Sequence, residues 1–68
     1  MSKNTALKNL IKALMDYYRA SNKLEDHPQY RDYEHLTYSV VSNITGLGYS
    51  DIKAADPAFI ATLESKEA

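Results

Sequence analysis

Residues 4–23 carry the sequence NTALKNLIKALMDYYRASNK, in which apolar positions repeat with the period of an α-helix. The apolar stripe is made of Leu7, Leu10, Ile11, Leu14 and Tyr18. The charged positions form a separate strip, made of Lys8, Lys12, Asp16, Arg19 and Lys23. No glycine or proline interrupts residues 1–27. The pattern predicts a first helix from about Asn4 to Lys23 that buries one face.

A break and a second helix are expected next. Residues 24–28 contain Pro28, and the residue before a proline is biased away from helical geometry. We therefore expect a second helix to begin near Pro28, with Asp26 or His27 as its cap. Its helical stripe is made of Tyr30, Tyr33, Thr37, Val40, Val41, Ile44 and Leu47. Residues 36–45 are also rich in β-branched side chains, so a strand there is the alternative.

Turn residues divide the remainder of the chain. Gly46 and Gly48 predict the end of the second helix, and a short helix is expected from about residue 50 to Ala55. Asp56 followed by Pro57 is typical of a helix start, with an acidic cap before a proline in the first turn. The sequence thus predicts an all-α fold for residues 1–68 as a single small domain. We expect a helical hairpin of two longer helices plus one or two short C-terminal helices.

Length and composition limit how this fold is stabilised. A chain of 68 residues buries only about 60% of the surface of its unfolded form, so its core is marginal. There are no cysteines to form disulfides, which leaves helix packing or self-association, and we expect a homodimer. No apolar run approaches the ~18 residues of a membrane span, and the first residues do not resemble a signal peptide. A cytoplasmic protein without membrane contact is expected.

Tyrosine dominates the aromatic residues, with six of them against one phenylalanine and no tryptophan. A tyrosine ring is apolar but its hydroxyl needs water or a partner, so tyrosine is suited to half-buried surfaces and to interfaces. This surplus predicts a small protein-binding module, an adaptor, inhibitor or regulator of a larger protein, with a phage-like or mobile-element-like composition. The predicted contact residues are Met15, Tyr17, Tyr18, Tyr30, Tyr33 and Tyr38.

Charge distribution raises a second hypothesis. Residues 1–23 hold five cations and one acid, whereas residues 24–68 hold three cations and eight acids. A basic first helix can bind a nucleic-acid backbone, and the residues that would do so are Lys8, Lys12, Arg19 and Lys23. A helix-turn-helix reading of residues 36–60 is weaker, because its second helix would present acids to phosphate. The nucleic-acid-binding regulator therefore stands as the alternative to protein binding.

Catalytic chemistry has little support in the sequence. His27, Asp32, Glu34 and His35 come closest to a metal or acid–base cluster, but their spacing matches no ligand motif. No serine lies in a nucleophile-elbow context. We expect a non-enzymatic protein that needs no cofactor and no metal.

Overall fold

This computed structural model describes residues 2–66, which contain four α-helices and one 3-10 turn. Their bounds are α1 Lys3–Ala20, the 3-10 turn η1 Lys23–Asp26, α2 Tyr33–Thr45, α3 Tyr49–Ala55 and α4 Pro57–Ser65. The described residues contain no strand, so the predicted all-α fold class is confirmed. The strand alternative for residues 36–45 is wrong, because the apolar periodicity of α2 outweighs its β-branched content.

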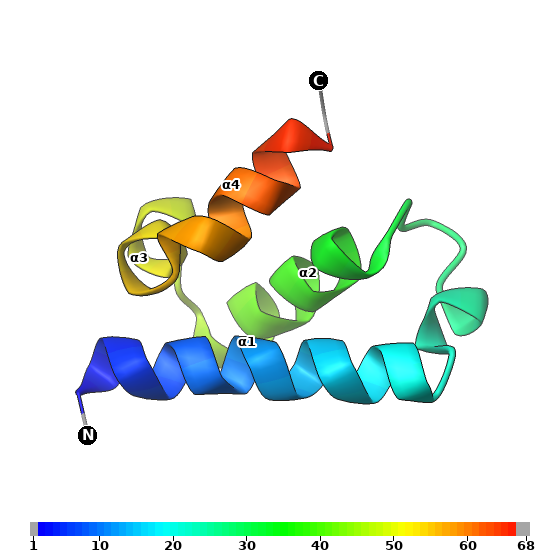
Figure 1. Cartoon of the computed structure of the whole chain (residues 1–68), viewed down its shortest axis with the longest axis horizontal. Helices are drawn as coiled ribbons and strands as arrows, with labels where there is room; N and C mark the ends of the chain where they lie inside the picture. The colour runs from blue at the N-terminus through cyan, green and yellow to red at the C-terminus, as the bar shows by residue number, and fades with distance from the viewer. Residues whose placement is uncertain (1, 67–68) are drawn as a thin grey trace.

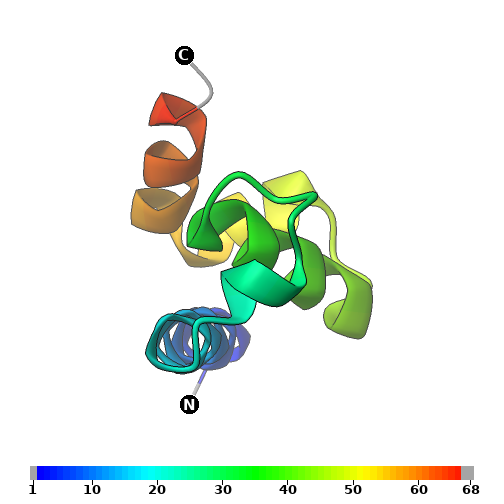
Figure 2. The same cartoon turned by 90° about the vertical axis from the view of Figure 1, so that its right-hand side faces the viewer.

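The long α1 forms one side of the molecule, and the other helices are arranged over it (Figure 1). The chain reverses after α1, and α2 returns obliquely above it and packs against it. The short α3 also packs on α1, near its N-terminal end, and α4 then rises over α3 and α2. Seen along α1, the helix α4 stands above it while α2 and α3 lie to one side (Figure 2). A simple two-helix hairpin is therefore not confirmed.

Every α-helix contributes to one apolar core. The buried cluster comprises Leu7, Ile11, Val41, Ile52, Ala55, Phe59, Ile60 and Leu63. Leu10, Leu14, Met15, Tyr38 and Leu47 pack around it and are half-buried. Ile44, which shares the predicted stripe of the second helix, is 63% exposed instead. Among the described helices, none has both the length and the apolarity to cross a membrane.

The start of α2 differs from the sequence prediction. The helix begins at Tyr33 rather than near Pro28, and Asp32 caps it in place of Asp26 or His27. The reversal after α1 uses Asn22 in the left-handed conformation (φ 54°) and then η1, so the connection between α1 and α2 extends over residues 21–32. Tyr30 consequently lies in this connection and not on a helix. The prediction that the second helix begins near Pro28 was therefore wrong by about one turn.

The end of α2 and the start of α4 agree with the sequence prediction. Gly46 ends α2 in the left-handed conformation, with φ 73°. Asp56 caps α4 by accepting a hydrogen bond from the Phe59 backbone N–H at 3.2 Å, and Pro57 occupies the first turn. Both features follow the usual preferences for helix ends, in which glycine tolerates positive φ and an acidic side chain satisfies a free N–H group.

We predict that the two glycines differ in their tolerance of alanine. A Cβ at either glycine meets no atom within 4 Å, but only Gly46 has a positive φ. Gly46→Ala should lower the free energy of unfolding by about 1 kcal/mol, since an L-residue is strained there. The free energy of unfolding of Gly48→Ala should stay within about 0.5 kcal/mol of the wild-type value, because the lower entropy of its unfolded chain offsets a slightly poorer helix cap. Urea unfolding followed by circular dichroism measures the free energy of unfolding of both variants. Equal losses would contradict the role of the positive φ at Gly46.

A second prediction concerns the cap of α2. Asp32 accepts hydrogen bonds from the backbone N–H of His35 at 2.9 Å and from its ring Nδ1 at 2.7 Å. Burial raises the pKa of Asp32, but these hydrogen bonds and the charges of His35 and Lys66 outweigh it and lower the pKa below the ordinary 3.8. The stabilisation is therefore complete above pH 3.8 and is lost as the pH falls through the lower pKa of the folded state.

Asp32→Ala should lower the free energy of unfolding by about 1 kcal/mol at neutral pH, and Asp32→Asn by less, because an amide oxygen still caps. Urea unfolding across a pH series measures the difference from wild type. The difference for Asp32→Ala should shrink below pH 3.8. Asp16→Asn, at an exposed position of α1, is the control and should change little. A difference that stays constant at all pH values would contradict the role of the charged cap.

Candidate functional site

A groove of about 380 Å³ lies between α1 and α4 and is open to solvent. We call it the α1–α4 groove. The residues that line it come from α1, from the cap of α4 and from α4 itself: Lys8, Asn9, Ile11, Lys12, Met15, Asp16, Arg19, Asp56, Ala58, Phe59 and Thr62. The groove exists because α4 packs on α3 and α2 and not along α1. Figure 2 shows the resulting separation of α4 from α1.

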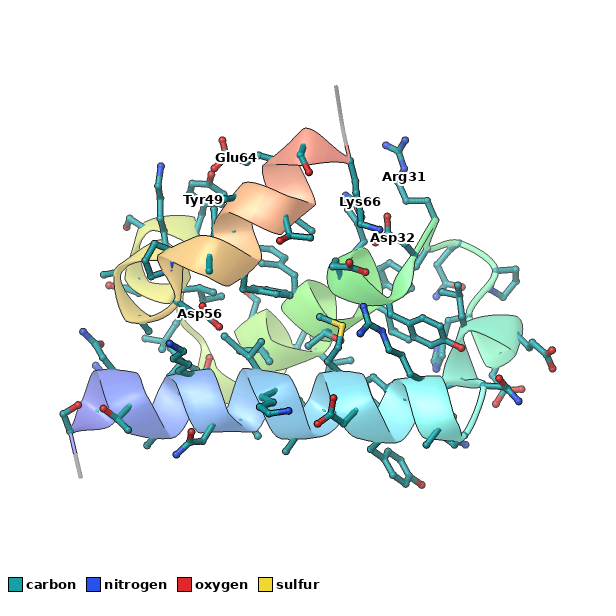
Figure 3. The ribbon with its side chains drawn as sticks, viewed as in Figure 1. Arg31, Asp32, Tyr49, Asp56, Glu64 and Lys66 are labelled. Carbon is teal, nitrogen blue, oxygen red and sulfur yellow. The ribbon has the colours of Figure 1, made fainter. Side chains whose placement is uncertain are left out.

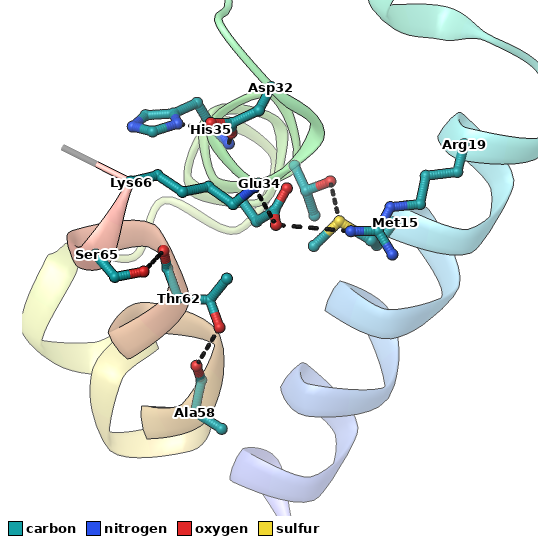
Figure 4. A network of polar contacts seen from close by, with 10 residues as sticks. Met15, Arg19, Asp32, Glu34, His35, Ala58, Thr62, Ser65 and Lys66 are labelled. Atoms are coloured by element: carbon teal, nitrogen blue, oxygen red, sulfur yellow. Dashed lines mark hydrogen bonds and ion pairs between the residues drawn. The ribbon is translucent and has the colours of Figure 1, made fainter.

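The floor of the groove is apolar. Ile11 and Phe59 are 2% and 7% exposed and belong to the core, so the groove reaches down to it. Met15 is half-buried, and its sulfur accepts a hydrogen bond from the hydroxyl of buried Thr37 at 3.8 Å. Ala58 and Thr62 on α4 face α1 across the groove (Figure 4). A methionine in such a floor can adapt its shape to different apolar partners.

Cations line the α1 side of the groove. Lys8, Lys12 and Arg19 are exposed, and we call them the basic rim. Lys12 pairs with exposed Asp16 at 2.9 Å, whereas no carboxylate of the described residues pairs with Lys8. Asp56 also lines the groove, but it is 8% exposed and is occupied as the cap of α4. The accessible charge along α1 is therefore mainly positive.

A buried carboxylate pairs with Arg19, one of the residues that line the groove. The side chain of Glu34 on α2 is 7% exposed, and its Oε2 lies 3.6 Å from Nη2 of Arg19 and 3.2 Å from Nζ of Lys66. These contacts join α1, α2 and the residue that ends α4 (Figure 4). Lys66 also lies close to Asp32 at the start of α2 (Figure 3). This arrangement holds the C-terminal end of α4 over α2.

The predicted tyrosine contacts do not gather at the groove. Tyr17 is 60% exposed and lies 5.9 Å from the ring of half-buried Tyr18. Tyr30 and Tyr33 are half-buried, and the hydroxyl of Tyr30 shares a hydrogen bond with Ser39 at 2.7 Å. The ring of Tyr38 packs against the core and lies 6.4 Å from Tyr49.

Of the residues proposed for protein binding, only Met15 lines the groove. Of those proposed for nucleic-acid binding, Lys8, Lys12 and Arg19 do, while Lys23 lies in η1 and pairs with Asp26 at 3.7 Å. The structure thus combines members of both sets in one place. Both sets remain predictions.

Three groove residues on α4 were not singled out from the sequence, namely Ala58, Phe59 and Thr62. Phe59 is the one phenylalanine of the chain, but its type alone does not distinguish a groove residue from a core residue. Ala58 and Thr62 are small and exposed, and no sequence pattern distinguishes them. Whether Ala58 and Thr62 line the groove depends on how α4 crosses α1.

The His27, Asp32, Glu34 and His35 set separates in the structure. Asp32 and His35 contact each other as part of the α2 cap, while Glu34 pairs with cations and the ring of His27 lies 6.3 Å from Tyr30. Within residues 2–66, no three histidine or acidic side chains are placed to share a metal ion.

Comparisons with protein families, with characterised proteins and with solved structures find no match to this chain. The functional argument therefore depends on the geometry of the groove.

We predict that the two cations around Glu34 are redundant. With either one present the buried carboxylate keeps an ion pair, so Arg19→Met and Lys66→Met should each cost less than about 1 kcal/mol. Removing both leaves an uncompensated buried charge, and the double variant should lose about 3 kcal/mol. A double-mutant cycle by urea unfolding measures this coupling. Additive losses, with no coupling between the two changes, would contradict this redundancy.

Proposed function

We propose that this protein is a non-enzymatic binding module that holds a segment of another protein in the α1–α4 groove. The observation that supports the proposal is an open groove whose apolar floor reaches the core and whose side is basic. An apolar side chain inserted there would remove surface from water, at about 25 cal/mol per Å², and would contact the packed Ile11 and Phe59 side chains. Anchors of this kind dominate the energy of protein interfaces.

The open shape of the groove favours a protein segment over a small molecule. Small-molecule sites enclose most of the surface of their ligand, whereas this groove is open to solvent between two helices. Its α1 side extends from Lys8 to Arg19, about 16 Å at the helical rise of about 1.5 Å per residue. That distance corresponds to about three turns of a helix. Helices that insert one apolar face into a groove are a common mode of recognition.

An alternative binding site is the set of predicted contact tyrosines, which we call the tyrosine surface: Tyr17, Tyr18, Tyr30, Tyr33 and Tyr38. Tyr17 is its most exposed member. An adaptor, inhibitor or regulator acting in the cytoplasm is compatible with either surface. One experiment can separate the two surfaces, because Tyr17 does not line the groove.

We predict that a peptide library displayed on phage yields binders that depend on the groove. Selection uses the wild-type protein, and each binder is then measured against three variants by fluorescence anisotropy. Ala58→Trp places a large ring in the groove and should weaken binding at least about tenfold, equal to about 1.4 kcal/mol. Ala61→Trp makes the same change at an exposed α4 position that does not line the groove and should have little effect.

Tyr17→Ser is the third variant and should also leave binding unchanged. Binding lost in Tyr17→Ser but kept in Ala58→Trp would move the function to the tyrosine surface and contradict the groove. A selection that yields no binder would contradict the proposal of a protein-binding module. Circular dichroism of each variant checks that the fold is intact.

A further inference from the structure

We propose that the segment held in the α1–α4 groove is an acidic amphipathic helix whose carboxylates meet the basic rim. This inference deepens the proposed function and depends on it. It rests on three features of the groove: the spacing of the rim cations, their accessibility and the position of the one exposed acid among them.

The rim cations are arranged at helical spacing. Lys8, Lys12 and Arg19 stand at positions i, i+4 and i+11 of α1, so they lie along one side of that helix. A helix placed alongside α1 has the same rise per residue, about 1.5 Å. When it runs parallel to α1, its own residues at i, i+4 and i+11 can therefore face the three cations in turn. A partner helix with glutamates at this spacing would place one carboxylate opposite each of the three rim cations.

The cations remain accessible to such a partner. Nζ of Lys12 holds only an exposed carboxylate, that of Asp16, with the two side chains 77% and 60% exposed. The side chain of Arg19 is 54% exposed, and its Nη2 lies 3.6 Å from Oε2 of Glu34, which Lys66 also pairs with at 3.2 Å. Lys8 has no carboxylate partner among the described residues. A partner carboxylate can therefore approach each cation without breaking a buried pair.

Asp16 adds selectivity to this pattern. It occupies position i+8 of the same rim, between Lys12 and Arg19. A partner acid opposite Asp16 would meet a like charge, which costs free energy at an interface. The favoured partner therefore has carboxylates at i, i+4 and i+11 and none at i+8. Leucine-like anchors on the adjoining face would meet Ile11, Met15 and Phe59.

A second hollow of the protein offers a useful contrast. It is of similar size, about 360 Å³, and is lined by Lys3, Ala6, Leu7, Leu10, Thr45 and Leu47. Its one cation, Lys3, is on the same helix as the basic rim but outside the α1–α4 groove. Lys3 therefore serves as a matched control for the charge of α1.

The experiment uses synthetic helical peptides of identical length. The first has glutamates at i, i+4 and i+11 beside a stripe of leucines. The second has the same composition, with the glutamates on the face opposite the leucines. The third has one glutamate moved from i+11 to i+8, and the fourth has glutamine at all three positions. Fluorescence anisotropy at low and high salt measures their affinities for the full chain.

The first peptide should bind at least about tenfold more tightly than the second and the fourth, and the third should bind more weakly than the first. Lys8→Glu combined with Lys12→Glu should reduce the affinity for the first peptide at least about tenfold, while Lys3→Glu should not. The same double variant should prefer a peptide with lysine in place of glutamate. This exchange of preference would not arise from a loss of folding.

Equal binding of the first and fourth peptides, still blocked by Ala58→Trp, would overturn the acidic partner while leaving the binding groove in place. Equal binding of the first and second would overturn the proposed register. A dimer in sedimentation that Ala58→Trp dissociates would assign the groove to a second copy of the chain and overturn the inference. Salt-dependent binding of a single-stranded oligonucleotide in preference to every peptide, lost in Lys8→Glu with Lys12→Glu, would assign the rim to nucleic acid instead.

Discussion

The whole arrangement depends on burying the apolar face of α1 with three shorter helices. At about 1.5 Å per residue, α1 is about 27 Å long, whereas α2, α3 and α4 have 13, 7 and 9 residues. The face that contains Leu7 and Ile11 is covered by α2 and α3, and α4 closes the core from above through Phe59, Ile60 and Leu63. On the side of α1 that contains Lys8 and Lys12, the described chain leaves a groove open to solvent. The α1–α4 groove follows from this shortage of covering residues.

The ion pairs of Glu34 link α2 to α1 and to the end of α4. A buried carboxylate is costly unless it is paired, and here the two cations come from different helices, Arg19 on α1 and Lys66 at the end of α4. The pair with Lys66 keeps the C-terminal end of α4 near α2, and the pair with Arg19 joins α2 to α1. Tyr49 supports the opposite face of α4, since its hydroxyl donates a hydrogen bond to Glu64 at 2.6 Å (Figure 3). The position of α4 is thereby fixed by polar contacts as well as by core packing, so the groove is a defined feature of the fold.

Local sequence signals predicted most of the secondary structure but not the tertiary arrangement. The period of α1, the glycine that ends α2 and the Asp56–Pro57 start of α4 act within a few residues, and each agrees with the structure. The start of α2 was misjudged because Pro28 and Asp32 are both plausible signals, and the left-handed Asn22 with the η1 turn decided between them. The groove itself could not be predicted, because it depends on the crossing of α1 and α4. Helical spacing already places Lys8, Lys12, Met15 and Arg19 on one side of α1, but only the position of α4 makes that side the wall of a groove.

The central claim is that a partner contacts the floor of the α1–α4 groove, and the methyl group of Met15 can report this directly. The chain has only two methionines, so labelling their methyl carbons with ¹³C gives two signals, which Met15→Leu assigns. The measurement is a methyl NMR titration with a peptide selected against the wild-type protein. The account predicts that the Met15 signal shifts and shows nuclear Overhauser effects to apolar protons of the peptide. A peptide that binds while the Met15 signal stays unchanged would contradict it.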